Sequence, residues 1–375
     1  ASNNTAVGFK SLNKNTTGTR NNAFGSLSLD ATTTGGYNNA FGFNSLGANT
    51  TGEENVAMGD NAMADNTTGD KNTAFGTSSL ANNTTADNNT AIGYAALNAN
   101  TTGAQNVSLG AYSMTANTQS NRNTALGYNT LSSHNLTSDS NGYNTCVGFQ
   151  AGSDITTGTQ NTFIGGLVGD TTTTASNNVA VGYNAFTANL TGAQNVAVGM
   201  SSMQTNTTGY NNTAVGWESM KALTTGALNV AVGQQAMLLA TTGDKNVCVG
   251  HNTLANLTTA DNNTAIGDNT LSANTTGADN TAVGANALDA NTTAAYNAAF
   301  GKDALTANTT GTENTSIGTF SMVNSTTGSF NTALGAGALF SSQTGADNVA
   351  IGLEAMRNTQ ASDNTAVGYR ALKQS

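Results

Sequence analysis

The chain contains no proline, although an average usage of about 5% would place many in a chain of 375 residues. Proline cannot donate a hydrogen bond to a β-ladder, and within sheets it is confined to edges and bulges. Its absence therefore predicts a backbone whose N–H groups are nearly all hydrogen-bonded. A disordered chain is disfavoured as well, because disordered sequences are usually rich in proline and charge and lack a periodic apolar position.

Charged residues are also scarce, at 9% of the chain against about 25% in an average soluble domain. The balance is acidic, with a formal net charge of −10. An acidic surface repels nucleic-acid phosphates and anionic lipids, so neither is expected as a partner. No apolar run approaches the length of about eighteen residues that crosses a bilayer, so no membrane insertion is expected.

Only two cysteines occur, Cys146 and Cys248, and they take the same position in two repeats that lie six units apart. At a strand spacing of about 4.8 Å they would be separated by about 29 Å, which excludes a disulfide within one chain. We interpret both as buried free thiols that stand in for alanine. No His/Cys cluster has zinc-site spacing. A catalytic site needs several different side chains at one place, and a regular repeat does not bring them together. We therefore expect no metal, no cofactor and no enzymatic activity.

The sequence consists instead of one repeated unit of seventeen residues. The glycine of an Ala-Val-Gly-like triplet recurs with this period from Gly8 onward, and 22 copies fill the chain. Such a short fixed period indicates units that pack on their neighbours along one direction. We predict one elongated repeat domain over residues 1–375, with irregular coils at 131–176. Because the chain opens in mid-repeat, we expect terminal caps and flanking domains to lie outside it.

The consensus unit reads Asn-Thr-Ala-Val-Gly-x-x-Ala-Leu-x-Ala-Asn-Thr-Thr-Gly-x-x. Its first five residues alternate as a strand does, a second short strand is predicted over Ala-Leu-x-Ala, and Asn-Thr-Thr-Gly supplies a turn. Each unit then makes one coil of an all-β, parallel β-solenoid. Stacking places the invariant first asparagines above one another as a hydrogen-bonded ladder. In the first eight units these are Asn4, Asn21, Asn38, Asn55, Asn72, Asn89, Asn106 and Asn123.

Two apolar columns are predicted to form the core, at the fourth position (for example Val7 and Ile92) and at the ninth (for example Leu12 and Met63). The other face of the first strand carries only small residues, mainly alanine and glycine. Small residues let another backbone approach closely, so we expect this face to pack against identical faces of other copies of the chain around a symmetry axis. The alternative is a single chain whose alanine face is hydrated.

Short strand motifs carry a resemblance to a known family. The segments Asn-Val-Ala-Val-Gly at 195–199 and 229–233, and Asn-Thr-Ala-Ile-Gly at 89–93 and 263–267, resemble head repeats of trimeric autotransporter adhesins. The longer unit with Asn-Thr-Thr-Gly is similar to repeats of phage tail fibres and large bacterial surface proteins. The resemblance implies a left-handed β-roll, assembled as a trimer, in a stalk or adhesive head. The adhesin head unit is a few residues shorter. In such fibres a C-terminal chaperone can cut itself off and leave a terminal serine. Ser375 is compatible with such a cut, and equally with an arbitrary boundary of the sequence.

Aromatic residues recur in the slot after the motif glycine. The eight are Phe9, Phe43, Tyr94, Tyr128, Phe149, Tyr183, Trp217 and Tyr369. We interpret the rings as covers for the turn over the core, and the alternative is an edge that stacks on sugar rings. The threonine pair before the turn glycine predicts a structural turn. Its alternative, an ice-binding array, would present at most one rank of threonines, because adjacent side chains on a strand face opposite ways.

The irregular segment 131–176 contains a four-residue insertion within residues 132–143, and this stretch includes His134 and Tyr143, both candidate surface-binding residues. We expect His134, and His251 elsewhere, to be exposed to solvent. The next two coils carry Gly152 and Gly169 where leucine belongs. Four apolar residues in unusual slots are predicted to fill the missing volume, namely Phe163, Ile155, Leu167 and Val168.

These features predict that the chain forms the shaft or head of a fibre, with a structural or adhesive role. The fibre would lie outside the cell, on the cell surface or on a virion. The expected partners are further copies of the chain and a cell-surface glycan or protein receptor. One alternative is a self-assembling extracellular filament or matrix protein whose coils stack end to end. Another is an ice-binding or glycan-binding solenoid.

Overall fold

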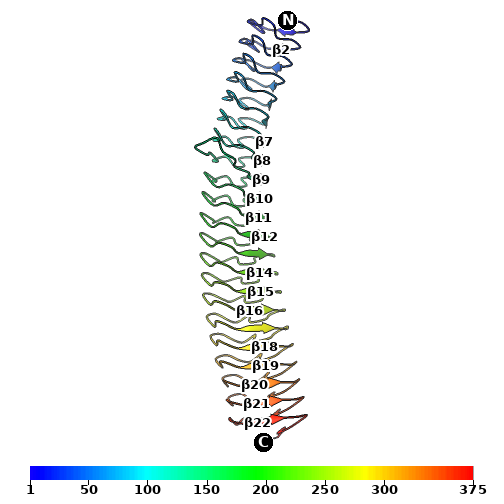
Figure 1. The fold of residues 1–375 in the computed structure, drawn as a ribbon, viewed down its shortest axis with the longest axis vertical. Helices are drawn as coiled ribbons and strands as arrows, with labels where there is room; N and C mark the ends of the chain where they lie inside the picture. Colours follow the sequence, from blue (N-terminus) through cyan, green and yellow to red (C-terminus); the bar gives the residue numbers. More distant parts are fainter. Residues whose placement is uncertain (375) are drawn as a thin grey trace. The chain divides into compact units, whose positions relative to one another are not determined.

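The computed structural model describes residues 1–374 and contains 22 three-residue strands and, within that range, no helix (Figure 1). Its contacts divide the chain into two units, 1–191 and 192–375, which are described separately. Unit 1 holds β1 (Thr5–Val7), β2 (Asn22–Phe24), β3 (Asn39–Phe41), β4 (Val56–Met58), β5 (Thr73–Phe75), β6 (Thr90–Ile92), β7 (Val107–Leu109), β8 (Thr124–Leu126), β9 (Thr145–Val147), β10 (Thr162–Ile164) and β11 (Val179–Val181). Unit 2 holds β12 (Val196–Val198), β13 (Thr213–Val215), β14 (Val230–Val232), β15 (Val247–Val249), β16 (Thr264–Ile266), β17 (Thr281–Val283), β18 (Ala298–Phe300), β19 (Thr315–Ile317), β20 (Thr332–Leu334), β21 (Val349–Ile351) and β22 (Thr365–Val367).

Within each unit, every strand pairs in parallel with the equivalent strand of the next coil. The register joins like positions, as in Thr73↔Thr90 and Ala74↔Ala91 between β5 and β6, and Thr264↔Thr281 between β16 and β17. One seventeen-residue repeat is therefore one coil, and the predicted parallel β-solenoid is confirmed. The left-handed sense and the trimer stay predictions.

The prediction of a second strand over Ala-Leu-x-Ala is wrong. That stretch forms turns, because the ninth residue has a left-handed backbone, as at Leu46 (φ 51°) and Met63 (φ 50°). A left-handed residue cannot continue a strand. The backbone still bonds from coil to coil, since Leu46 N–H donates to Ala62 O at 3.0 Å and Asn44 N–H donates to Ser26 O at 2.9 Å. Stacking therefore holds conformations that an isolated chain would disfavour.

The strand turns its other face to the core: the face predicted to point outward points inward. The third-position residue is fully buried from Ala23 to Ala180 in unit 1 and from Ala197 to Ala350 in unit 2, and the ninth-position Leu or Met of most coils is buried as well. The fourth-position residue points outward and is half-buried or exposed, so its assignment to the core was wrong. The first, third and fifth residues share the inward face. The asparagine amide and the ninth side chain already occupy the interior, which leaves room mainly for alanine at the third position.

The asparagine ladder is confirmed. In unit 1 each first-position side chain accepts from the backbone N–H of the next asparagine; Asn72 Oδ1 accepts from Asn89 N at 2.9 Å. Its Nδ2 donates to Ala86 O at 2.8 Å and to Asn55 Oδ1 at 3.2 Å. The same pattern runs through unit 2, and from Asn21 to Asn348 these asparagines are at most 1% exposed. A buried amide can only be stable when its donors and acceptors are satisfied in this way.

A second buried column lies at the twelfth position, and sequence reasoning missed it. In unit 1 Asn66 Nδ2 donates to Asn49 Oδ1 at 2.9 Å, and Asn83 Nδ2 donates to Asn66 Oδ1 at 2.8 Å. In unit 2 Asn291 Nδ2 donates to Asn274 Oδ1 at 3.0 Å. The asparagine of Asn-Thr-Thr-Gly is therefore a core residue, and not only part of a turn.

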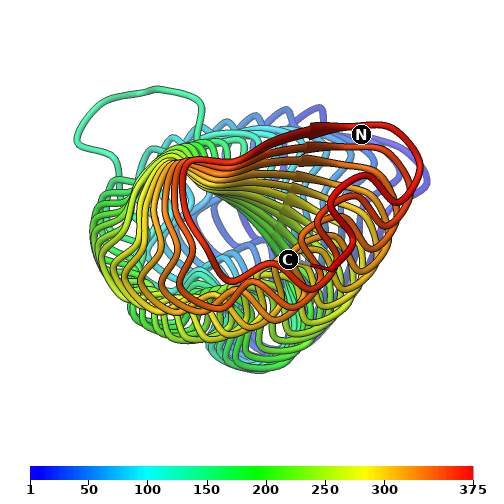
Figure 2. The same cartoon turned by 90° about the horizontal axis from the view of Figure 1, so that it is seen from below.

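The irregular segment repacks largely as predicted. Phe163, Ile155 and Val168 are completely buried. A Cβ added to Gly169 would lie 2.4 Å from Phe163 Cε2, so the phenylalanine ring occupies the space of the missing leucine. Leu167 is only half-buried and does not take part in this filling. The inserted residues form a loop that projects from unit 1 (aquamarine in Figure 2).

Candidate interaction surfaces

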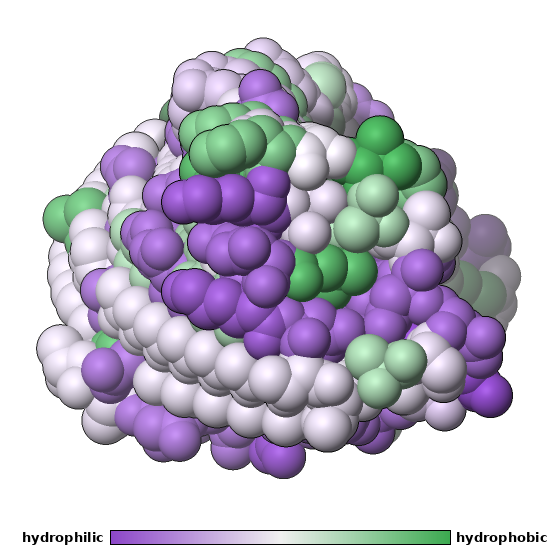
Figure 3. Space-filling model, turned by 90° about the horizontal axis from the view of Figure 1, so that it is seen from above, coloured by the Kyte–Doolittle hydropathy of each residue, from purple (hydrophilic) through white to green (hydrophobic). Residues whose placement is uncertain are grey.

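The outer face of the strands carries the fourth-position side chains to the surface. Along unit 1 these are Val7, Phe24, Phe41, Met58, Phe75, Ile92, Leu109, Leu126, Val147, Ile164 and Val181, and along unit 2 they are Val198, Val215, Val232, Val249, Ile266, Val283, Phe300, Ile317, Leu334, Ile351 and Val367. Between the end coils the most exposed of them range from 36 to 46% exposed. In one pair of neighbouring coils the rings of Phe24 and Phe41 stack with their centroids 4.9 Å apart. We call each row the fourth-position column; within each unit it is a continuous apolar stripe, because like positions pair in register from coil to coil. The view in Figure 3 shows hydrophobic patches among hydrophilic residues.

No residue of the 22 strands is charged. The second-position side chains that flank the column are Thr, Val, Asn or Ala, and apart from the end coils most are half-buried. The outer face of each sheet is therefore neutral although the chain carries a net charge of −10. Two such faces can approach one another without charge repulsion.

A second surface in unit 1 is an aromatic ladder. The centroid distance is 5.3 Å from Tyr94 to Tyr112, 5.9 Å from Tyr112 to Tyr128, and 5.7 Å from Tyr128 to Phe149. The first two contacts are edge-to-face and the third is stacked, which are the favoured aromatic geometries. All four rings are exposed, and the interpretation that residues in this slot cover the turn over the core stays a prediction. Tyr112 was not predicted, because it lies one residue beyond the slot.

Two other aromatic candidates lie apart from this ladder. Tyr183 is exposed, and Gly166 takes the slot in the coil between it and Phe149. Trp217 is exposed in unit 2. The structure therefore brings Tyr94, Tyr128 and Phe149 together and leaves Tyr183 and Trp217 as separate rings.

The prediction that His134 is exposed was wrong. The residue takes the twelfth position, where other coils bury asparagine, and it is completely buried. Its Nε2 hydrogen-bonds Ser120 Oγ at 3.0 Å, and this oxygen also accepts from Asn123 Nδ2 at 2.9 Å. Burial lowers the pKa of His134 to about 4, so the ring is neutral at pH 7. It is a core residue at the base of the inserted loop and cannot contact a ligand at the surface.

Tyr143, at the end of that loop, is exposed as predicted. Arg122 Nη1 donates to its hydroxyl at 2.8 Å, and the guanidinium lies 5.7 Å from the ring centroid. His251 is also exposed as predicted and contacts Asp268 Oδ1 through Nδ1 at 2.9 Å.

The two threonines of the pair before the turn glycine lie in different environments. The first hydroxyl bonds the next coil, as where Thr50 Oγ1 donates to Thr67 O at 2.9 Å. The second is exposed, for example at Thr51, Thr68 and Thr85. As predicted, the turn presents one rank of threonines and not two.

The described residues contain no metal-binding cluster and no reactive cysteine at the surface. Within residues 1–374 no three His, Cys, Asp or Glu side chains are placed to hold a metal ion. Cys146 and Cys248 are free and buried, as predicted, and burial raises the pKa of both thiols. Within the same residues no helix is long and apolar enough to cross a membrane.

No protein-family model matches the sequence, and no curated protein matches it either. The resemblance to autotransporter heads and tail fibres therefore stays a prediction.

Proposed function

We propose that the chain is a structural and adhesive element of a fibre on a cell surface, on a virion or outside the cell. In this proposal copies associate in parallel through their fourth-position columns, as a homotrimer. The coil ladders stiffen each unit, and repetition around the axis multiplies weak contacts with a receptor.

The observation that carries the proposal is that the apolar fourth-position columns reach the surface along each unit, where every member is half-buried or exposed. A monomer rarely exposes a contiguous apolar patch larger than a few hundred Å². Burying the remaining surface of a side chain that is about two-fifths exposed contributes roughly 0.5–1 kcal/mol. Six fourth-position residues of unit 1 and seven of unit 2 are at least 36% exposed, which makes association through this face favourable by several kcal/mol on that same area scale.

The best-matched partner for this face is another copy of the same chain. Both copies repeat their apolar side chains at the same strand spacing, so parallel copies match coil for coil along the contact. The face is neutral, so association through it brings no like charges into contact although each chain is acidic. This face replaces the alanine face of the original prediction, because the alanines lie inside each coil.

Light scattering after size-exclusion chromatography tests the association. The wild-type chain of 37.6 kDa is expected to elute as a defined species of about three chain masses. The triple variant Ile92→Lys, Leu109→Lys and Leu126→Lys should shift it to monomer. The matched control puts lysine at Thr51, Thr68 and Thr85, which are exposed at the turn, and should leave the mass unchanged. A monomeric wild type would refute the proposal, and a polymer without defined size would favour end-to-end filaments instead.

A further inference from the structure

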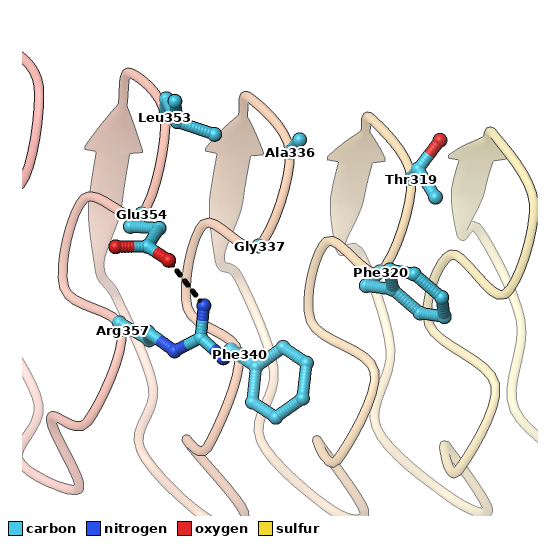
Figure 4. A pocket seen from close by; sticks show the side chains of 8 residues that line it. All are labelled: Thr319, Phe320, Ala336, Gly337, Phe340, Leu353, Glu354 and Arg357. Carbon is cyan, nitrogen blue, oxygen red and sulfur yellow. Dashed lines mark hydrogen bonds and ion pairs between the residues drawn. The ribbon is translucent and has the colours of Figure 1, made fainter.

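Unit 2 contains a shallow hollow of about 190 Å³ on the turn side of β19, β20 and β21 (Figure 4). Its walls include Phe320, Phe340, Leu353, Glu354 and Arg357, and Gly337 forms its floor. Figure 4 shows Gly337 between Phe320 and Glu354, with the Arg357 side chain extended toward Phe340.

The hollow exists because one side chain is missing from a column. The seventh residue of each coil has a left-handed backbone, and most carry a side chain there, such as Asp303, Phe320 and Glu354. Gly337 has the same conformation, with φ of 62°, but no side chain. A Cβ added to it would meet no atom closer than Arg357 Nη1 at 3.6 Å. The missing side chain therefore leaves this part of the hollow open to solvent.

The walls combine aromatic rings with a fixed cation. Phe320 is exposed and Phe340 is half-buried, so both rings offer apolar surface to the hollow. The guanidinium of Arg357 lies 4.5 Å from the Phe340 ring centroid, and its Nη1 donates to Glu354 Oε1 at 2.6 Å. These contacts hold the guanidinium in place, and its planar group has five N–H donors to share among partners.

The electrostatic field at the hollow is positive within an acidic chain. Glu354 is contacted by three cations, Arg357 at 2.6 Å, Arg370 at 2.7 Å and Lys373 at 2.9 Å. Hydrogen bonds from Lys373 and Arg370 lower the pKa of the Glu354 carboxyl to about 2, so it stays ionised at pH 7. One carboxylate therefore faces three positive charges. Lys302, which is paired with Asp303 at 3.1 Å, also lies 5.6 Å from the Phe320 ring centroid.

We propose that this hollow binds the acidic sugar unit of a glycan, with its carboxylate on Arg357 and the apolar face of its ring against Phe320 and Phe340. A carboxylate meets the positive field and pairs with the guanidinium, while the C–H face of a pyranose stacks on aromatic rings. The hollow is open and holds about one ring, so it suits a terminal or side-branch sugar and not a buried ligand. The receptor of the proposed adhesive function would then be an acidic glycan. The biological meaning of this site rests on that proposed function.

Saturation-transfer difference NMR with methyl glucuronide tests the site on the whole chain. Neutral methyl glucoside and benzoate serve as comparison probes. The wild type should give ring-proton signals with the glucuronide that weaken as salt rises, and much weaker signals with the glucoside. Arg357→Gln should weaken glucuronide binding by roughly tenfold or more, because a hydrogen bond to a charged partner is lost.

Gly337→Asn provides the sharpest variant. Asparagine tolerates a left-handed backbone and already takes the seventh position at Asn44, Asn61 and Asn269, so folding should be unaffected while the hollow is filled. The matched control Ser201→Asn changes the same position of a distant coil of unit 2 and should bind like wild type.

Four results would overturn the assignment: no glucuronide signal, equal signals from the neutral glucoside, binding of benzoate alone, or undiminished binding by Gly337→Asn. The outcome is separable from that of the proposed fibre. Glucuronide binding requires only a folded unit 2, so a monomeric wild type that binds would refute association alone, and a trimer that does not bind would refute this site alone.

Discussion

Replacing Asn72 by alanine removes one rung of the asparagine ladder from the middle of unit 1. The substitution leaves the backbone N–H of Asn89 without the acceptor it has at 2.9 Å, in a place that water does not reach. It also removes the donors to Ala86 O and Asn55 Oδ1. Ala86 O keeps one donor, Asn83 Nδ2 at 3.0 Å, so the orphaned N–H dominates the loss.

The magnitude follows from these contacts. An unsatisfied buried N–H costs about 1–3 kcal/mol, and each of the two lost side-chain bonds contributes about 1 kcal/mol. The local free energy of opening should therefore fall by about 3–5 kcal/mol. The matched control is Asn82→Ala, which removes an exposed asparagine side chain ten residues along the same coil and should change it by less than about 0.5 kcal/mol.

Native-state hydrogen exchange is the appropriate assay, because long repeat arrays do not unfold as one cooperative unit and a global free energy is poorly defined for them. The Asn89 amide should exchange at least about 100-fold faster in Asn72→Ala than in wild type, since each 1.4 kcal/mol is a factor of ten. Equal exchange rates at Asn89 in the Asn72→Ala and Asn82→Ala variants would show that the ladder does not hold the coils together.

Two further perturbations follow from the irregular segment. Phe163→Ala should lower the local free energy of opening around residue 163 by about 3–5 kcal/mol, because Gly152 and Gly169 offer no side chain to close the cavity. Native-state hydrogen exchange checks this against Phe43→Ala, which removes an exposed ring and should have little effect. The pKa of His134 is lowered from 6.5 to about 4, so its contribution to stability is complete above pH 6.5 and is lost as the pH falls through 4, by up to about 3 kcal/mol. Urea unfolding at pH 7 and pH 4 should show this loss in the wild type and less of it in His134→Asn, which restores the residue type of the neighbouring coils; an equal loss in both would refute the assignment.

Much of the fold could be predicted because stacking turns sequence period into spatial repetition. The seventeen-residue coil, the Asn ladder and the filling of the space at Gly152 and Gly169 all followed from residues that recur or fail to recur at one position. The surfaces were harder to predict. Tyr112 joins the aromatic ladder only because its coil packs between Tyr94 and Tyr128, and the hollow at Gly337 exists only because its neighbours carry side chains.

The amino-acid sequence by itself determined the period, the parallel register and the alternation of two side-chain sets on each strand, because these depend on local geometry and on identical units lying in contact. Only the tertiary structure decided which set faces inward. That choice depends on how much volume remains after the coil closes around the asparagine amide and the ninth side chain, and alanine fits this volume while Phe24 or Ile92 does not. The same closure buried His134 in a position where the sequence pattern indicated a loop residue, since burial is a property of the closed coil and not of the residue type.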